Sequence, residues 1–184
     1  FARRHYLAFR LSAWRPNDAG NALIEAALVF PILFIFFFGV SELCEGFIAS
    51  RRVEAAAFTA ADLVARLQTV NTDDLVALKS IIDETIKPLP VASVGLVVTS
   101  VIADENNATT VAWSEALGSG VTALTANTSI VLPAGLTLSN TSVIFAQVSY
   151  TFQSTLSTLI VGGVQLRARA YQQPRFAQQV AKTS

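Results

Sequence analysis

Hydrophobic side chains are concentrated in one unbroken run near the N-terminus. Residues 22–40 read ALIEAALVFPILFIFFFGV, and Glu25 is the only charged side chain among them. As an α-helix rising about 1.5 Å per residue, the run is about 28 Å long, close to the thickness of the hydrocarbon core of a bilayer. The pattern predicts a membrane-spanning helix over residues 21–43, after a basic leader over residues 1–20 and before an extracytoplasmic domain over residues 44–184.

Helical spacing of apolar positions continues beyond this run. The positions are Val53, Ala57, Ala60, Val64 and Leu67. Their recurrence at intervals of three and four residues predicts one long helix from Ala22 to about Thr69, whose second half is amphipathic. Small side chains between Ala55 and Ala61 allow another element to approach closely. Packing against the domain's own sheet is favoured there over a seam between subunits.

A second, shorter amphipathic helix is predicted to follow. Asn71 or Thr72 caps its N-terminus, and acidic side chains in its first turn complement the helix dipole. Its apolar stripe consists of Leu75, Leu78, Ile82 and Ile86. Pro88 and Pro90 come directly afterwards and end the helix.

The rest of the chain shows the period-two alternation that is typical of strands. Strands are predicted over residues 91–102, 109–113, 142–152 and 164–171. In the first of them, one parity places Ala92, Val94, Leu96, Val98 and Ile102 on the same face. Residues 104–108 form a hairpin turn, residues 118–129 a surface loop, and Gly162 and Gly163 a further turn. The predicted fold class is α+β: a long N-terminal transmembrane helix continues into an amphipathic helix, which packs on a small antiparallel sheet of about four strands.

Charge is distributed unevenly, although the formal net charge is zero. The basic residues around the apolar run are Arg3, Arg4, Arg10 and Arg15 before it and Arg51 and Arg52 after it. This asymmetry favours a cytoplasmic N-terminus. Beyond the run, acidic and basic side chains balance, so the outer domain lacks the positive field that nucleic-acid binding requires. No nucleic acid is expected as a partner.

Glu25 is the informative side chain of the apolar run. A charged group within a span costs about 2.5 to 3.5 kcal/mol at the centre of the bilayer and less near its surface, so compensation is expected. Gly20 lies five positions earlier. Cleavage after Gly20 would give Asn21 a new α-ammonium group, which the Glu25 carboxylate of another subunit can neutralise inside a helical bundle. The alternative is that Glu25 lies at the headgroup boundary and reaches water.

Pro31 interrupts the hydrogen-bond ladder of the predicted span, because proline lacks a backbone N–H. It indicates a kink. The kink either provides a flexible point for packing into a filament or is an ordinary feature of a membrane helix, and the sequence favours neither.

The combination of Gly20, Glu25, an apolar run and an early Pro31 resembles the class III signal of type IV prepilins. It is especially similar to TadE-like minor pseudopilins of tight-adherence (Tad/Flp) pilus systems. Val131–Phe152 and the closing YQQPR of Tyr171–Arg175 also resemble that family, whereas Ile24-Glu25-Ala26 departs from its more usual Val-Glu-Phe. The resemblance implies a pilin-like fold and a bacterial inner-membrane location. It implies prepilin peptidase, the lipid bilayer and other pilin or pseudopilin subunits as partners.

Side chains that carry catalysis are missing from the predicted outer domain. The only histidine, His5, lies in the leader, and the only cysteine, Cys44, lies where the span ends. No Ser/His or Cys/His pair can assemble outside, so neither an enzyme, a cofactor nor a small-molecule substrate is expected. Cys44 is expected to be a buried small apolar residue, with an intersubunit disulfide as the alternative.

Several polar clusters are interpreted as surface features. Asp104 and its neighbours up to Asn107 lack a complete calcium-loop pattern, so a turn is favoured over a Ca²⁺ site. The acids Asp73, Asp74, Asp83 and Glu84 of the second helix occupy capping and solvent positions. Sequons at Asn107, Asn127 and Asn140 are taken as loop composition. Arg167 and Arg169 are expected on a solvated strand face.

The expected function is a minor pseudopilin, a structural subunit of a Tad-type pilus that is processed after Gly20. An uncleaved single-span accessory or sensor subunit is the alternative. A conventional signal peptide cut near Ala55 or Ala57 is disfavoured, because charged residues separate those alanines from the apolar run. The chain starts with Phe1 and contains no Met, which predicts a trimmed product or a missing start.

Overall fold

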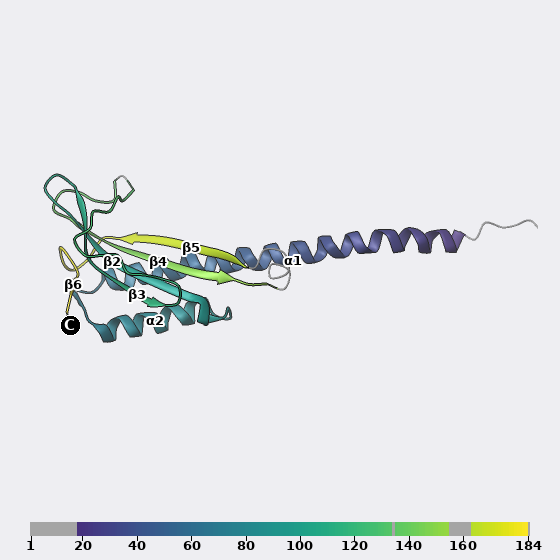
Figure 1. Cartoon of the computed structure of the whole chain (residues 1–184), viewed down its shortest axis with the longest axis horizontal. Coiled ribbons are helices and arrows are strands. Elements are labelled where there is room, and N and C mark those ends of the chain that lie inside the picture. Colours follow the sequence, from purple (N-terminus) through teal and green to yellow (C-terminus); the bar gives the residue numbers. More distant parts are fainter. Residues whose placement is uncertain (1–17, 134, 155–162, 184) are drawn as a thin grey trace, which may run out of the picture. The chain divides into compact units, whose positions relative to one another are not determined.

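The computed structural model describes residues 18–133, 135–154 and 163–183, and the chain divides into two compact units, Phe1–Ser41 and Glu42–Ser184. The elements are, in chain order, α1 (Asp18–Ala65), β1 (Thr69–Val70), α2 (Thr72–Ile86), the 3-10 turn η1 (Val91–Ser93), β2 (Val94–Ala103), β3 (Thr109–Gly118), β4 (Ser142–Phe152), β5 (Val164–Gln172) and β6 (Ala181–Lys182) (Figure 1). The predicted α+β class is confirmed.

The unit Glu42–Ser184 is built on a four-stranded antiparallel sheet of order β3-β2-β4-β5. The central strand β2 is buried on both faces: Val94, Leu96 and Val98 belong to the main core, whereas Val97 and Val101 lie on the opposite face. A separate two-residue parallel pair joins β1 to β6. The four-stranded sheet β3-β2-β4-β5 confirms the predicted antiparallel sheet of about four strands.

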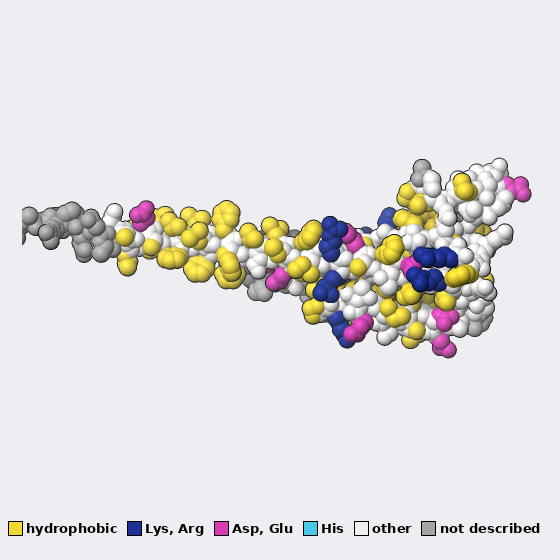
Figure 2. Space-filling model, turned by 180° about the vertical axis from the view of Figure 1, so that it is seen from behind, with side chains coloured by type: hydrophobic (Ala, Val, Ile, Leu, Met, Phe, Trp, Pro, Cys, Tyr) yellow, Lys and Arg dark blue, Asp and Glu magenta, His cyan; other side chains and the backbone are white. Residues whose placement is uncertain are grey.

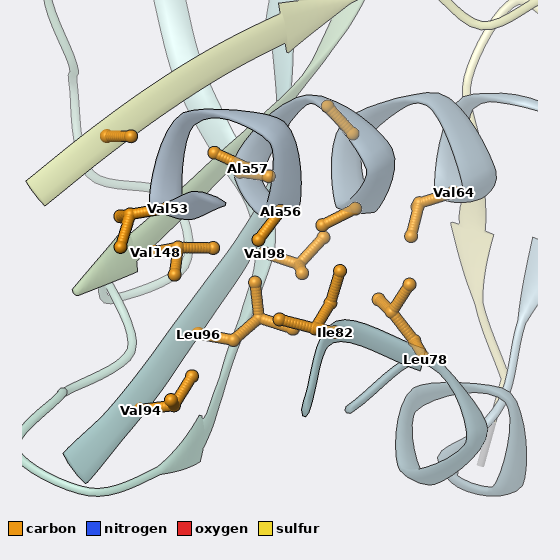
Figure 3. Packing of buried hydrophobic residues seen from close by; sticks show 14 of the residues in the cluster. Val53, Ala56, Ala57, Val64, Leu78, Ile82, Val94, Leu96, Val98 and Val148 are labelled. Carbon is orange, nitrogen blue, oxygen red and sulfur yellow. The ribbon is translucent and has the colours of Figure 1, made fainter. Parts of the chain in front are cut away.

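α1 packs on the sheet through very small side chains. Its fully buried alanines are Ala49, Ala56, Ala57, Ala60, Ala61 and Ala65. In the close-up, Val53, Ala56 and Ala57 of α1 lie near Leu96 and Val98 of β2 and Val148 of β4, and Leu78 and Ile82 of α2 point into the same cluster (Figure 3). Because alanine side chains end at Cβ, the helix backbone can approach the sheet closely. This confirms core packing as the role of the small residues.

The second helix forms as its sequence pattern predicts. The Asn71 side chain accepts a hydrogen bond from the Asp74 N–H at 2.8 Å, and the Asp74 carboxylate accepts one from the Asn71 N–H at 3.0 Å. This reciprocal capping box satisfies two backbone donors that have no partner inside the helix. The predicted stripe is the buried face of α2, and the helix ends at Ile86, before both prolines.

Several predicted boundaries were wrong. The strand expected over residues 109–113 continues to Gly118. α1 ends at Ala65, about four residues early, because Thr69 and Val70 pair with β6 instead of extending the helix. The strand expected from Val91 begins at Val94, and Ala92 lies exposed in the 3-10 turn. Pro90 directly precedes that turn and has no N–H to donate to a strand ladder, which is consistent with the later start.

The C-terminal segment is tied back onto the domain by contacts that the sequence did not predict. The Arg175 N–H donates to the Ala65 carbonyl at 2.9 Å, and its guanidinium binds the Asp62 carboxylate. The Trp113 indole donates to the carbonyl of Val180 at 2.8 Å, and Val180 is fully buried. The C-terminal segment therefore packs against the end of α1 and against β3.

Tyr150 gives the domain a predicted stability change at alkaline pH. Burial raises the pKa of its hydroxyl above the usual 10.0, and a side-chain hydrogen bond with Ser93 opposes part of that shift. Since the folded-state pKa is raised, the stabilisation is complete below about pH 10 and is lost as pH rises through the folded pKa, at no more than about 1.4 kcal/mol per pH unit. Urea unfolding between about pH 9 and pH 11 should therefore show a steeper loss of stability for the wild type than for Tyr150→Phe. Parallel curves would contradict the prediction.

Candidate membrane and assembly helix

The first part of α1 presents its apolar side chains outward. None of residues 20–41 is buried, and Leu23, Ile35 and Phe36 are each about 70 % exposed. Figure 2 shows hydrophobic side chains covering this part of the helix on the visible face. An apolar surface of this extent requires a lipid or protein environment to cover it. The segment is the candidate functional site.

The length and composition of α1 suit a bilayer. Within the described residues, α1 is the one helix long and apolar enough to cross a membrane. Apart from the groups at its ends and the Ala27 carbonyl, which Pro31 leaves without an N–H donor, its backbone groups can be satisfied inside the helix, as a lipid environment demands. α1 therefore provides the long apolar helix that the predicted membrane span requires.

Gly20 and Asn21 lie within the first turn of α1, because the helix begins at Asp18 and not at Ala22 as predicted. Both residues are exposed. The N–H groups of a helix's first turn have no intrahelical acceptors, so opening this turn disrupts few hydrogen bonds. The peptide bond between them is therefore in a part of the helix that unwinds at low cost. The arginines of the leader and His5 lie outside the described residues.

Glu25 lies four residues after Asn21, so both occupy one face of α1. The Glu25 side chain is exposed, and no ion pair joins it to another described residue. One face at the start of the apolar helix thus presents an acid and, after cleavage at Gly20, would present an amine beside it.

A ridge of aromatic side chains follows Glu25. Phe30, Phe34 and Phe38 recur every four residues, and successive ring centroids are 6.2 and 6.4 Å apart. Ridges of this i, i+4 type fit into the grooves of a neighbouring helix. This ridge was not predicted, although the four-residue spacing of the phenylalanines is visible in the sequence. Pro31 lies inside α1, which continues past it, and the predicted kink stays a prediction.

Basic and aromatic side chains meet where the apolar run has ended. The Arg51 guanidinium lies 5.0 Å from the ring centroid of Phe47 and 3.0 Å from the Glu54 carboxylate. The neighbouring Arg52 donates to the backbone carbonyl of Lys87. Aromatic rings and long basic side chains are typical of membrane–water interfaces. This cluster is suited to the edge of a membrane span.

The remaining candidates for chemistry lie on the surface of the folded unit. The Asp104 carboxylate accepts hydrogen bonds from the N–H groups of Asn106 and Ala108, both at 2.8 Å, so it closes its own turn. Arg167 and Arg169 are exposed as expected, and no group of metal-ligating side chains occurs among the described residues. The three sequon asparagines have φ angles of 60° to 62°, which confirms turn positions.

The prediction for Cys44 was wrong, because Cys44 is exposed and not buried. The face of α1 that packs on the sheet starts with Ala49 and Val53. Cys44 is five residues before Ala49, which turns its side chain about 140° away from that face.

An α+β unit, preceded by an exposed apolar helix of membrane-spanning length, is compatible with the class of single-span membrane proteins that carry one folded domain. The family model of TadE-like proteins matches residues 20–62, which lie entirely within α1. The resemblance to TadE-like pseudopilins is thereby confirmed over this helix, whereas Val131–Phe152 and Tyr171–Arg175 lie outside the match. No curated protein and no solved structure matches the chain.

Proposed function

We propose that this chain is a minor pseudopilin, a non-enzymatic structural subunit of a Tad-type pilus. The observation that carries the proposal is the TadE-like match, which begins at Gly20 and follows α1 to residue 62. In this role the apolar helix is stored in the bacterial inner membrane with its N-terminus in the cytoplasm. The unit Glu42–Ser184 lies outside, in the periplasm or in the pilus.

Prepilin peptidase removes the leader after Gly20 in the proposed pathway. The new Asn21 amine and the Glu25 carboxylate then supply opposite charges on one helix face. Pairing between neighbouring subunits offsets the cost of desolvating both charges and sets their register, because a pair buried among apolar helices stabilises only with good geometry. The bilayer, the peptidase and other pilin or pseudopilin subunits are the partners of this pathway.

N-terminal mapping by intact mass of the native protein tests the proposal directly. The expected mature N-terminus is Asn21, and Gly20→Val should retain the leader because the branched side chain obstructs close approach to the scissile bond. Ala22→Val, two residues further on, is the matched control and should be processed normally. A wild-type protein that keeps residues 1–20 in the membrane would instead support an uncleaved accessory or sensor subunit.

A further inference from the structure

Three Asn-x-Ser/Thr sequons lie at one end of the four-stranded sheet. Their asparagines, Asn107, Asn127 and Asn140, are all exposed, and each has a φ angle of 60° to 62°. The Asn140 N–H donates to the Asp104 carbonyl at 3.2 Å, and the Asn127 N–H donates to the Val111 carbonyl at 2.8 Å. All three sequons therefore lie around the end of the sheet where β2 turns into β3.

The hydroxyl groups of the sequons differ in how the fold holds them. Transfer of a sugar to a sequon requires both the asparagine amide and the hydroxyl two residues later, so both groups must be accessible. In the Asn140 sequon, Ser142 is only 2 % exposed, and its hydroxyl donates to a backbone carbonyl of the C-terminal segment. In the Asn107 sequon, Thr109 is half-buried, and its hydroxyl donates to the Ile130 carbonyl. The fold therefore occupies the hydroxyl of both sequons.

The Asn127 sequon has both of its functional groups accessible. Asn127, Thr128 and Ser129 end a run of eight exposed residues, 122–129. Neither the Asn127 amide nor the Ser129 hydroxyl forms a hydrogen bond with another described residue. The backbone of the turn is nevertheless fixed, because the Val111 N–H of β3 donates to the Thr128 carbonyl at 3.0 Å. A preformed turn of this kind presents both side chains to an enzyme at a low cost in conformational entropy.

We propose that Asn127 is a site of N-linked glycosylation, with a lipid-pyrophosphate-linked oligosaccharide as the donor. The side-chain amide nitrogen bonds to the anomeric carbon of the sugar, and the bond from that carbon to the pyrophosphate oxygen breaks. The lipid pyrophosphate leaves with the electron pair, and the amide nitrogen gives up one proton to the transferase. The inference rests on the proposed location of the unit Glu42–Ser184 outside the membrane, because sequons are acceptors in exported proteins.

Site-resolved mass spectrometry of the protein, purified from the membrane and surface fractions of its native host, tests the assignment. An oligosaccharide is expected on Asn127. Ser129→Ala removes only the hydroxyl and should lower the glycosylated fraction at least tenfold, whereas Ser129→Thr supplies a hydroxyl again and should keep it. Since Ser129 is exposed and its hydroxyl has no partner among the described residues, the far-UV circular dichroism of both variants should match the wild type.

Glycine substitutions compare the three sequons without straining their turns, because glycine adopts a positive φ at no steric cost. Asn127→Gly should abolish the modification, whereas Asn107→Gly and Asn140→Gly should leave it unchanged. An unmodified Asn127 in the native protein, a glycan that survives Ser129→Ala, or a sugar on Asn107 or Asn140 in place of Asn127 would each overturn the proposal.

N-terminal mapping of the same sample separates this inference from the proposed pseudopilin function. A mature N-terminus at Asn21 together with an unmodified Asn127 overturns the glycosylation site alone. A retained leader together with a glycosylated Asn127 overturns the pseudopilin proposal and supports the glycosylation site. A confirmed glycan would also place the loop of residues 122–129 in solvent in any assembly, because a bulky, hydrated group is not buried between subunits.

Discussion

Replacing Ala60 with leucine is expected to lower the free energy of unfolding of the unit Glu42–Ser184 by about 3 kcal/mol. Ala60 is fully buried in the cluster that also contains Leu96 and Val98 of the central strand. Three additional carbon atoms fit there only if the helix moves away from the sheet or neighbouring side chains leave their preferred rotamers. Leucine is a good helix former, so helix propensity does not account for the loss.

Ala55→Leu is the matched control, because Ala55 is exposed on the same helix. Its effect should stay within about 0.5 kcal/mol. Urea unfolding of the detergent-solubilised full chain is followed through Trp113, which is buried against the tail, in a Trp14→Phe background. Equal effects of the two substitutions would show that α1 does not pack closely on the sheet.

Local patterns were sufficient where a feature depends on residues close in sequence. The N-terminal cap of α2, its buried stripe and its end before Pro88 all arise within one short segment. The alternation in β4 likewise predicted the buried positions Ile144 and Val148. Each of these features follows from capping residues, prolines or periodicity within the segment, so no knowledge of distant neighbours was needed.

Features that depend on distant partners could not be read in this way. The hydrogen bond from Trp113 to Val180 joins residues 67 positions apart. The tail segment near Arg175 shows no periodicity that points to Asp62, and Cys44 was placed in a core although the helix turns it outward. A side chain's burial on a long helix depends on which faces other elements cover, and this becomes known only with the tertiary structure.

The candidate site likewise has features that local sequence determines and features that depend on distant contacts. The length and apolar character of the span, and the spacing of Gly20 and Glu25, are sequence properties and were predicted. The exposure of residues 20–41 and the hydrogen bond from Arg52 to the Lys87 carbonyl depend on where the other elements pack. Surfaces that remain uncovered after folding are therefore the part of the site that only the structure supplies.

Glu25→Leu is expected to leave membrane insertion intact while reducing incorporation into surface pili by more than 100-fold. Removing the carboxylate makes the apolar run more hydrophobic, so insertion should be as good or better. In an assembled bundle, however, the processed Asn21 amine of a neighbour would be left buried without its partner, which costs about 3 to 5 kcal/mol. Since about 1.4 kcal/mol corresponds to a tenfold change in an equilibrium constant, that cost accounts for the loss.

Two further substitutions separate charge from shape at this position. Glu25→Gln keeps the size of the side chain but removes its charge, so it should fail to assemble as Glu25→Leu does. Glu25→Asp keeps the charge with a shorter reach and should retain part of the incorporation. Immunoblots that compare the sheared surface fraction with the membrane fraction measure both steps, and N-terminal mapping confirms that each variant is processed. Wild-type incorporation of Glu25→Gln would show that the charge of Glu25 does not direct assembly, and a headgroup position for this side chain would then explain its presence in the span.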